Sequence, residues 1–206
     1  MNVVILTYDW PPRNAVSVHR PYSWAKYLAE RGVDVTVLTA AKRSFDEPLD
    51  LQLSTLPVTV LEIPYSGGFG LADWFLRLSA FRKLARRLKT FVTRKTNRLI
   101  DPRAPWRGAA QPHALRLAPI ADFVISTCAP GFVHLLGMDM KKANPRLQWI
   151  ADYRDLWSQS YTNEVTQSVR RSMREQERLS VGLYADRITA VSEDLSSKLS
   201  RFLNKP

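Results

Sequence analysis

A short polar stretch near the last third of the chain carries side chains that could do chemistry. Asp152 ends a buried-looking apolar run, and Arg154, Asp155 and Trp157 follow it closely. Carboxylates can orient or deprotonate a hydroxyl, a guanidinium can bind phosphate, and an indole can stack on a sugar ring. The alternative is that Asp155 caps a short helix while Arg154 pairs with a carboxylate. Because an unpaired buried carboxylate is costly, Asp152 should have a specific partner in either case.

A second polar group lies in a loop near the amino terminus. Pro11 and Pro12 interrupt the chain after its first apolar run, and a helical pattern begins at about residue 18. Cations beside a helix amino terminus suit an anion such as a diphosphate. The alternative is a loop with scattered polar residues. The candidates for phosphate or acceptor binding here are Arg13, Ser17, His19 and Arg20.

Apolar patterning predicts the elements that position these residues. Continuous β-type runs predict strands at 3–8, 33–39, 58–63, 122–127, 147–152 and 187–192. Helical spacing predicts helices at 18–31, from 130 to about 144, at 164–184 and at 193–203, and a short helix ending near 117. Six strands alternating with helices predict an α/β fold: a doubly wound, mainly parallel, Rossmann-like sheet with helices on both faces, in a single domain of residues 1–206.

In such sheets, ligands bind beyond the carboxyl ends of the strands. This rule adds three candidates that follow predicted strands. Thr127 ends the fourth strand, and His134 comes shortly after it, where it could face the cleft as a hydrogen-bond donor or be structural. Glu193 follows the sixth strand. The stretch around Asp152 therefore lies at the edge of the sheet where a site would be built.

The positive charge of the chain is concentrated in one segment. The net charge is +11, and eleven cations stand against Asp101 between residues 77 and 107. We interpret residues 71–107 as a basic amphipathic helical insertion, which could lie on an anionic membrane, bind nucleic acid or form a solvated face. The absence of any nucleic-acid-binding module disfavours the second option. The predicted membrane-facing or anion-facing cations are Arg82, Lys83, Arg86, Arg87, Lys89, Arg94 and Lys95.

Several classes of protein are disfavoured by what the sequence lacks. It has no G-x-G-x-x-G after the first strand, no P-loop motif and no G-x-S-x-G elbow. Cys128 is the single cysteine, which excludes an intrachain disulfide and a zinc cluster of cysteines, and we assign it to packing. No cofactor or metal is therefore expected. The lack of a signal peptide or a membrane-spanning run predicts a cytoplasmic protein, peripherally associated with the inner membrane.

The ordered motifs resemble a known family across nearly the whole chain. They are YDWPP, HRPYSWAKYLAERGVDVTVLT, DPRAPW, ADFVISTCAPGFVHLLG, WIADYRDLW and YADRITAVSEDLSSKL. Together they resemble the amino-terminal domain of bacterial family-4 glycosyltransferases of the GT-B fold, of the type that builds lipopolysaccharide and exopolysaccharide. The resemblance implies an acceptor-binding domain, with a nucleotide-sugar bound mainly by a separate carboxyl-terminal donor domain, and metal-independent transfer with retention.

The resemblance also assigns roles. Asp152 and Asp155 are the expected catalytic, acceptor-contacting carboxylates, and Arg154 is expected to touch a sugar or phosphate. Two departures stand out: Asn14-Ala15-Val16-Ser17 replaces the family's Gly-Gly loop, and Asp152-Tyr153-Arg154-Asp155 stands where many members have a histidine. No E-x7-E pair of the donor domain is found, so we expect this chain to be half of an enzyme, inactive alone. The alternative is a module that binds anionic lipid or glycan, or one subunit of a two-chain enzyme.

Overall fold

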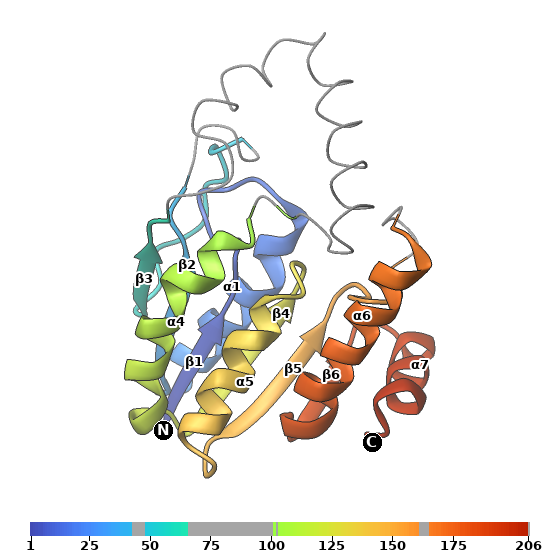
Figure 1. Cartoon of the computed structure of the whole chain (residues 1–206). Coiled ribbons are helices and arrows are strands. Elements are labelled where there is room, and N and C mark those ends of the chain that lie inside the picture. Colours follow the sequence, from blue (N-terminus) through green and yellow to red (C-terminus); the bar gives the residue numbers. More distant parts are fainter. Residues whose placement is uncertain (43–47, 66–100, 102, 161–164, 206) are drawn as a thin grey trace, which may run out of the picture.

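The computed structural model describes residues 1–42, 48–65, 101, 103–160 and 165–205, and its framework is one parallel sheet (Figure 1). The six strands are β1 (Asn2–Leu6), β2 (Asp34–Ala40), β3 (Thr59–Ile63), β4 (Phe123–Cys128), β5 (Gln148–Tyr153) and β6 (Arg187–Ala190). Their order in the sheet is β3-β2-β1-β4-β5-β6, and every pairing is parallel. The predicted doubly wound, Rossmann-like fold is confirmed, and each strand lies within two residues of its predicted bounds.

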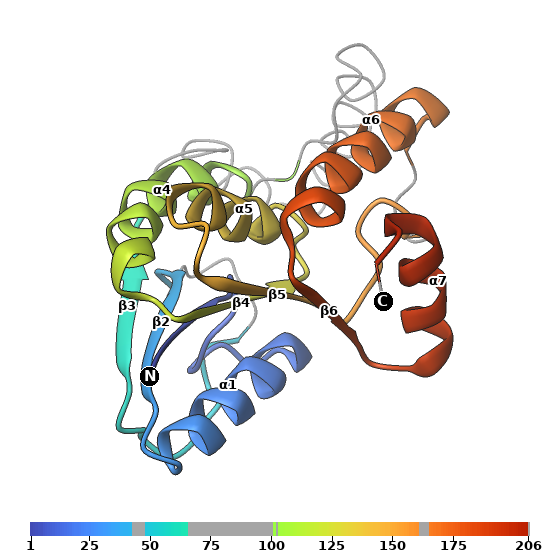
Figure 2. The same ribbon diagram turned by 90° about the horizontal axis from the view of Figure 1, so that it is seen from below.

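Helices cover both faces of the sheet. The helical segments are α1 (Val16–Ala29), α4 (Pro105–Leu117) with the 3-10 turn η1 (Ala118–Ile120), α5 (Val133–Ala143), α6 (Gln167–Glu177) with the π-helical turn η2 (Arg178–Gly182), and α7 (Glu193–Leu203). Figure 2 shows α4, α5 and α6 on one face and α1 on the other, while α7 lies beside β6 at the edge of the sheet and its buried leucines join the core beneath α4, α5 and α6. This arrangement follows from right-handed crossovers between parallel strands, which place helices on opposite faces in the two halves of the sheet.

Most of the predicted basic insertion lies outside the described residues. That holds for residues 71–100, and therefore for the predicted membrane-facing cations from Arg82 to Lys95. The end of the predicted segment is described: residues 105–107 form the first turn of α4, with Pro105 at its start. Trp106 in this turn is fully buried, so residues 105–107 belong to the helix layer over the sheet.

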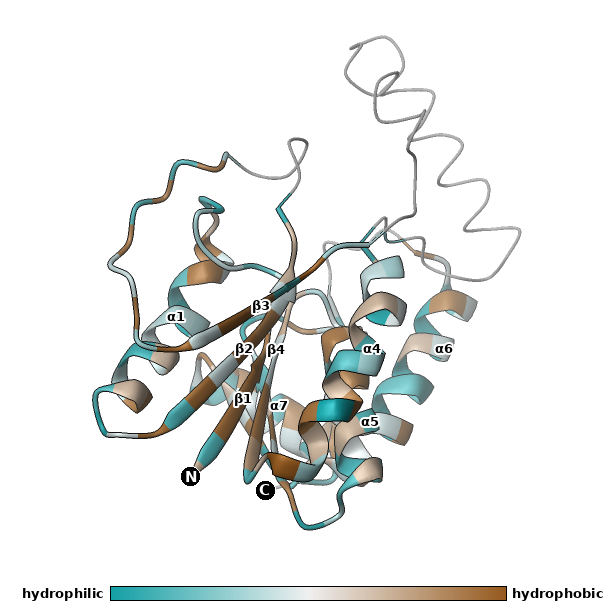
Figure 3. Cartoon of the chain, turned by 90° about the vertical axis from the view of Figure 1, so that its left-hand side faces the viewer, coloured by the Kyte–Doolittle hydropathy of each residue, from teal (hydrophilic) through white to brown (hydrophobic). Residues whose placement is uncertain are grey.

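The side chains of each strand alternate between two apolar layers, as the pleat requires. On β5, Trp149, Ala151 and Tyr153 join the larger core beneath α4, α5 and α6. The intervening residues, Ile150 and Asp152, therefore point toward the α1 face. Figure 3 shows that the strands are mainly hydrophobic, whereas the helices carry hydrophobic and hydrophilic stripes. The direction of Asp152 is the feature of the fold that matters most for the site.

Local signals fix the ends of two helices. Gly32 follows α1 with φ of 74°, a left-handed conformation that glycine adopts without strain. The Oγ of Ser192 accepts a hydrogen bond from the backbone N–H of Leu195 at 3.3 Å and caps α7. These two ends set where β2 begins and where the chain leaves β6.

Candidate functional site

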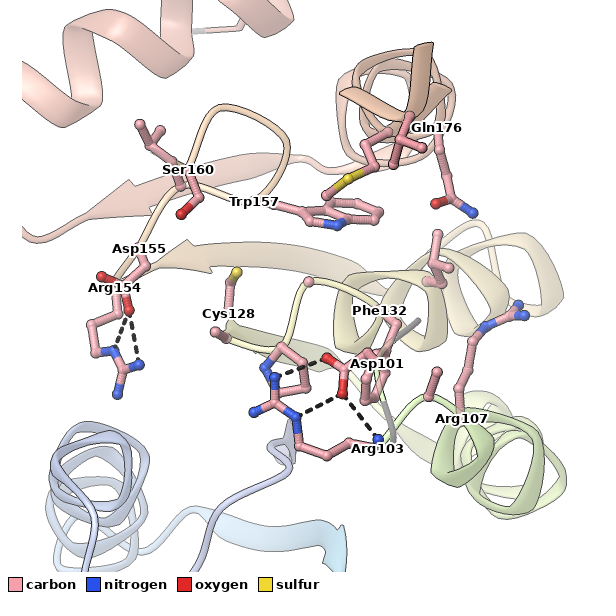
Figure 4. A pocket seen from close by; sticks show the side chains of 18 of the residues that line it. Asp101, Arg103, Arg107, Cys128, Phe132, Arg154, Asp155, Trp157, Ser160 and Gln176 are labelled. Carbon is pink, nitrogen blue, oxygen red and sulfur yellow. Dashed lines mark hydrogen bonds and ion pairs between the residues drawn. The ribbon is translucent and has the colours of Figure 1, made fainter. Parts of the chain in front are cut away.

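A pocket of about 1060 Å³ opens at the carboxyl ends of β4 and β5 (Figure 4). Its walls come from the start of α4, the turn after β4, the first turn of α5, the loop after β5, one side of α6 and the first turn of α7. Parallel strands bring these segments to one edge although they are far apart in sequence. The lining includes Arg103 and Arg107, the turn from Cys128 to Phe132, the loop from Arg154 to Trp157, and Val169, Met173 and Gln176 of α6.

The guanidinium groups of the pocket are held by carboxylates. Arg103 binds Asp101 through Nε at 3.0 Å and Nη2 at 2.8 Å. Arg154 binds Oδ2 of Asp155 through Nε at 3.0 Å and Nη2 at 2.8 Å. Arg107 donates to Asp139 at 2.8 Å. Such pairing fixes the direction of each planar group, which prepares it for a phosphate or a second carboxylate.

Asp155 is the carboxylate of the predicted pair that lines the pocket. Its side chain is 59% exposed, and both bonds from Arg154 go to Oδ2. Within the part of the chain that the structure describes, Oδ1 of Asp155 has no hydrogen-bond partner. This oxygen can therefore accept a hydrogen bond from a ligand hydroxyl.

Asp152 lies elsewhere. It is fully buried, and its carboxylate accepts from Arg20 Nε at 3.1 Å, Arg20 Nη2 at 2.7 Å and Thr189 Oγ1 at 2.7 Å. The predicted need for a specific partner is confirmed. However, the side chain points to the α1 face and does not line the pocket. The structure thus separates the two carboxylates that the sequence placed together, because Asp152 is still part of β5 and faces α1, whereas Asp155 lies in the loop beyond the strand.

Asp9 organises the loop after β1, and the sequence analysis did not single it out. Its carboxylate accepts from Nη1 of Arg13 and, at 2.5 Å, from Oγ of Ser17. Arg13 is buried, with Cζ 4.8 Å from the centre of the Tyr8 ring. Arg13 and Ser17 thus hold the loop, while His19 is exposed on α1. The signal was available: a carboxylate directly follows the first strand.

His134 is buried and does not face the pocket. Its Nδ1 lies 2.8 Å from Ser126 Oγ, which also accepts the indole N–H of Trp149 at 2.8 Å. The direction of the bond between Ser126 and Nδ1 depends on the imidazole tautomer, because the Ser126 hydroxyl has one proton and two lone pairs. Burial lowers the pKa of His134 to about 3, so the ring is neutral. Of the two alternatives for His134, the cleft-facing donor is wrong and the structural role is supported, because α5 places the buried ring beside Trp157 and Tyr153, whose rings lie 6.3 and 4.7 Å away.

The remaining predicted residues are spread over both sides of the sheet edge. Thr127 is nearly buried beside Asp152, its register partner on β5. Glu193 is exposed in the first turn of α7. Cys128 touches the pocket but is 1% exposed, and burial raises the pKa of its thiol, which agrees with the predicted packing role.

Trp157 forms part of the pocket wall through a close fit with a glycine. A Cβ at Gly131 would lie 2.2 Å from two carbons of the Trp157 ring, so the ring occupies the space that a side chain would need. Apolar residues continue this wall. They are Phe132, Leu135, Leu156, Val169, Met173 and Leu195.

In the described ranges, no group of three or more His, Cys, Asp or Glu residues could hold a metal ion. No described helix is both long and apolar enough to cross a bilayer. No protein-family model matches the chain, and no curated protein matches it.

Proposed function

We propose that this chain is the acceptor-binding half of a retaining glycosyltransferase that moves a sugar from a nucleotide-sugar to a lipid-linked glycan in cell-surface polysaccharide synthesis. The observation that carries the proposal is the pocket, which combines fixed arginines with a continuous apolar wall at the carboxyl edge of a parallel sheet. The ordered sequence motifs support the same assignment.

The size and chemistry of the pocket suit an amphipathic anion. Pockets for small ligands span about 300–1,000 Å³, and the volume here is about 1060 Å³. Arg103, Arg107 and Arg154 can donate to a diphosphate through charge-assisted bonds, which are stronger than neutral ones. The apolar wall along α6 can cover the first part of a lipid chain. A diphosphate that joins a lipid to a sugar would match both the arginines and the apolar wall.

Within this proposal, Asp155 contacts the acceptor and Asp152 has a supporting role. The free Oδ1 of Asp155 accepts from an acceptor hydroxyl. Asp152 positions Arg20, whose Nη1 makes no hydrogen bond within the described residues and whose side chain is 32% exposed. Arg20 can then face the anionic part of a substrate at the same sheet edge.

The donor and the membrane complete the proposal. The nucleotide-sugar is bound mainly by a separate donor domain or chain, and transfer uses no metal or other cofactor. The cations between Arg82 and Lys95, outside the described residues, hold the protein on the anionic cytoplasmic face of the inner membrane. Nucleic acid is not a proposed partner.

One observation favours the alternative of a non-catalytic module. Among the described residues, both carboxylates that line the pocket, Asp101 and Asp155, are paired with arginines. Because both carboxylates already bind arginines, a pocket of this kind could hold an anionic lipid or glycan without chemistry.

A panel of probes tests the proposal and separates the two functions. Binding to the purified chain is measured by equilibrium dialysis with a short-prenyl diphosphate monosaccharide, the same prenyl diphosphate without sugar, the free monosaccharide and a nucleotide-sugar. The proposal predicts tightest binding of the sugar-linked probe and no saturable binding of the nucleotide-sugar. Equal binding of the prenyl diphosphate with and without sugar would support the lipid-binding module, and no binding of either would contradict both.

A further inference from the structure

The loop that forms one wall of the pocket is tied to α6 through a buried acid. Glu177, at the end of α6, is fully buried, and its Oε2 accepts the backbone N–H of Ser158 at 3.1 Å. Tyr153 and the Ser158 side chain also face this carboxylate. Burying an acid is costly unless hydrogen bonds or a neighbouring charge compensate for its lost hydration.

We propose that Glu177 is the positioning residue of the pocket: its carboxylate holds the loop at Ser158 and so fixes Arg154, Asp155 and Trp157. The contact of these three residues with an acceptor rests on the proposed function. The attachment of the loop to Glu177 does not depend on it.

The contacts around the loop support this assignment. Trp157 directly precedes Ser158 and is pressed against Gly131, where no side chain would fit. On the other side, Nη1 of Arg170 donates to the carbonyl of Ser160 at 2.9 Å. The loop after β5 is therefore held between the turn after β4 and α6. The carboxylate of Glu177 makes one of the bonds that fix the loop to α6. Loss of the hydrogen bond at Ser158 would therefore let the neighbouring Trp157 move in the pocket wall.

Glu177 also makes the hold sensitive to protons. Burial raises the pKa of Glu177, against the opposing effects of Ser158, Tyr153 and the Arg174 charge on α6. The neighbouring groups do not titrate near neutral pH: burial raises the pKa of Tyr153 and of Cys128 and lowers the pKa of His134 to about 3. Among these buried groups, Glu177 is the carboxylic acid, and its pKa lies above the usual range of a glutamate.

The direction of the effect follows from the raised pKa. Above that pKa, the charged carboxylate accepts the Ser158 N–H through a charge-assisted bond, which is stronger than a neutral one. As the pH falls through the pKa, the bond weakens and the loop loosens. The free energy of unfolding changes in the opposite sense, since a buried acid with a raised pKa stabilises the fold most below its unfolded pKa and loses that contribution as pH rises.

Nuclear magnetic resonance on the unliganded chain tests the hold directly. Glu177→Leu removes the acceptor, Glu177→Gln keeps an acceptor but cannot titrate, and Glu175→Gln changes an exposed acid on the same helix. Hydrogen exchange of the Ser158 amide should be at least roughly tenfold faster in Glu177→Leu and near the wild-type rate in the other two. The pH-dependent shift of this amide should be present in the wild type and Glu175→Gln and absent in Glu177→Gln.

Two results would overturn the proposal: unchanged exchange at Ser158 in Glu177→Leu, or a pH-dependent shift that persists in Glu177→Gln. If Glu177→Leu does not fold, the titration in Glu177→Gln decides alone. The same variants are then tested with the short-prenyl diphosphate monosaccharide, which Glu177→Leu should bind at least roughly tenfold more weakly than Glu177→Gln. Failure of the wild type to bind it would refute the proposed function and leave the amide result standing.

Discussion

The ion pair between Arg20 and Asp152 provides a test of whether Asp152 is a structural or a substrate-contacting residue. Asp152 is fully buried and takes three hydrogen-bond contacts from the Arg20 guanidinium and one from Thr189. Arg20→Met leaves the carboxylate buried with Thr189 alone. Asp152→Asn keeps an acceptor but leaves the Arg20 charge without its partner.

The expected magnitudes follow from the burial of each group. Breaking a buried ion pair costs about 3–5 kcal/mol, and because the Arg20 side chain is 32% exposed, we expect about 2–4 kcal/mol for Arg20→Met. Asp152→Asn should cost about 1–3 kcal/mol, since Arg20 can reach water. The double variant should cost less than the sum by about 1–3 kcal/mol.

Urea unfolding followed by circular dichroism measures these free energies, with similar slopes required across the variants. Lys26→Met is the matched control on α1, because Lys26 and Glu30 form an exposed pair at 4.0 Å, and it should cost less than about 0.5 kcal/mol. Additive single changes, with coupling under about 0.5 kcal/mol, would refute the reasoning. So would an Asp152→Asn protein of wild-type stability that no longer binds the prenyl diphosphate monosaccharide, because that result would make Asp152 a ligand contact.

Three further predictions concern packing, acid stability and membranes. Gly137→Ala should destabilise the fold by about 1–3 kcal/mol in urea unfolding, because its Cβ would lie 2.4 Å from the buried Trp149 ring, whereas Gly108→Ala, with nothing within 4 Å, should not destabilise it. Burial lowers the pKa of His134 to about 3, so as the pH falls the unfolded state binds a proton on this residue before the folded state does. The free energy of unfolding should therefore fall by up to about 1.4 kcal/mol per pH unit below pH 6.5, and His134→Phe should remove this loss. Equal acid sensitivity of the wild type and His134→Phe would contradict this. The chain should sediment with anionic vesicles and be released by salt, and unchanged sedimentation after charge reversal to glutamate would exclude the three cations tested, Arg86, Arg87 and Lys89.

The fold was predictable from the sequence because its signals are local. Continuous apolar runs located the strands, and alternation with helices predicted a parallel sheet. Gly32 and Ser192 marked the ends of α1 and β6 by their own backbone and side-chain chemistry. The edge of the sheet where the pocket opens was also predicted, since it follows from strand direction alone.

The composition of the pocket was less predictable because it depends on side-chain direction and on distant segments. Alternation along β5 predicts that Asp152 and Tyr153 face opposite sides, but not which side meets α1. His134 looked available because it begins a helix after a strand, yet the helix turns it inward onto Ser126. Glu177 could not be found from the sequence, since a glutamate in a charged helical stretch is normally a solvated residue.

The most direct measurement of the central claim is the affinity of the purified chain for a short-prenyl diphosphate monosaccharide with and without Arg154. Arg154 lines the pocket. Arg116 serves as the matched control, because it is exposed near the carboxyl end of α4, whereas the start of α4 lines the pocket. Loss of a charge-assisted bond should weaken binding by about 10- to 150-fold in Arg154→Met, and Arg116→Met should bind like the wild type. Equal affinity of the two variants, or no saturable binding by the wild type, would contradict an acceptor site in this pocket.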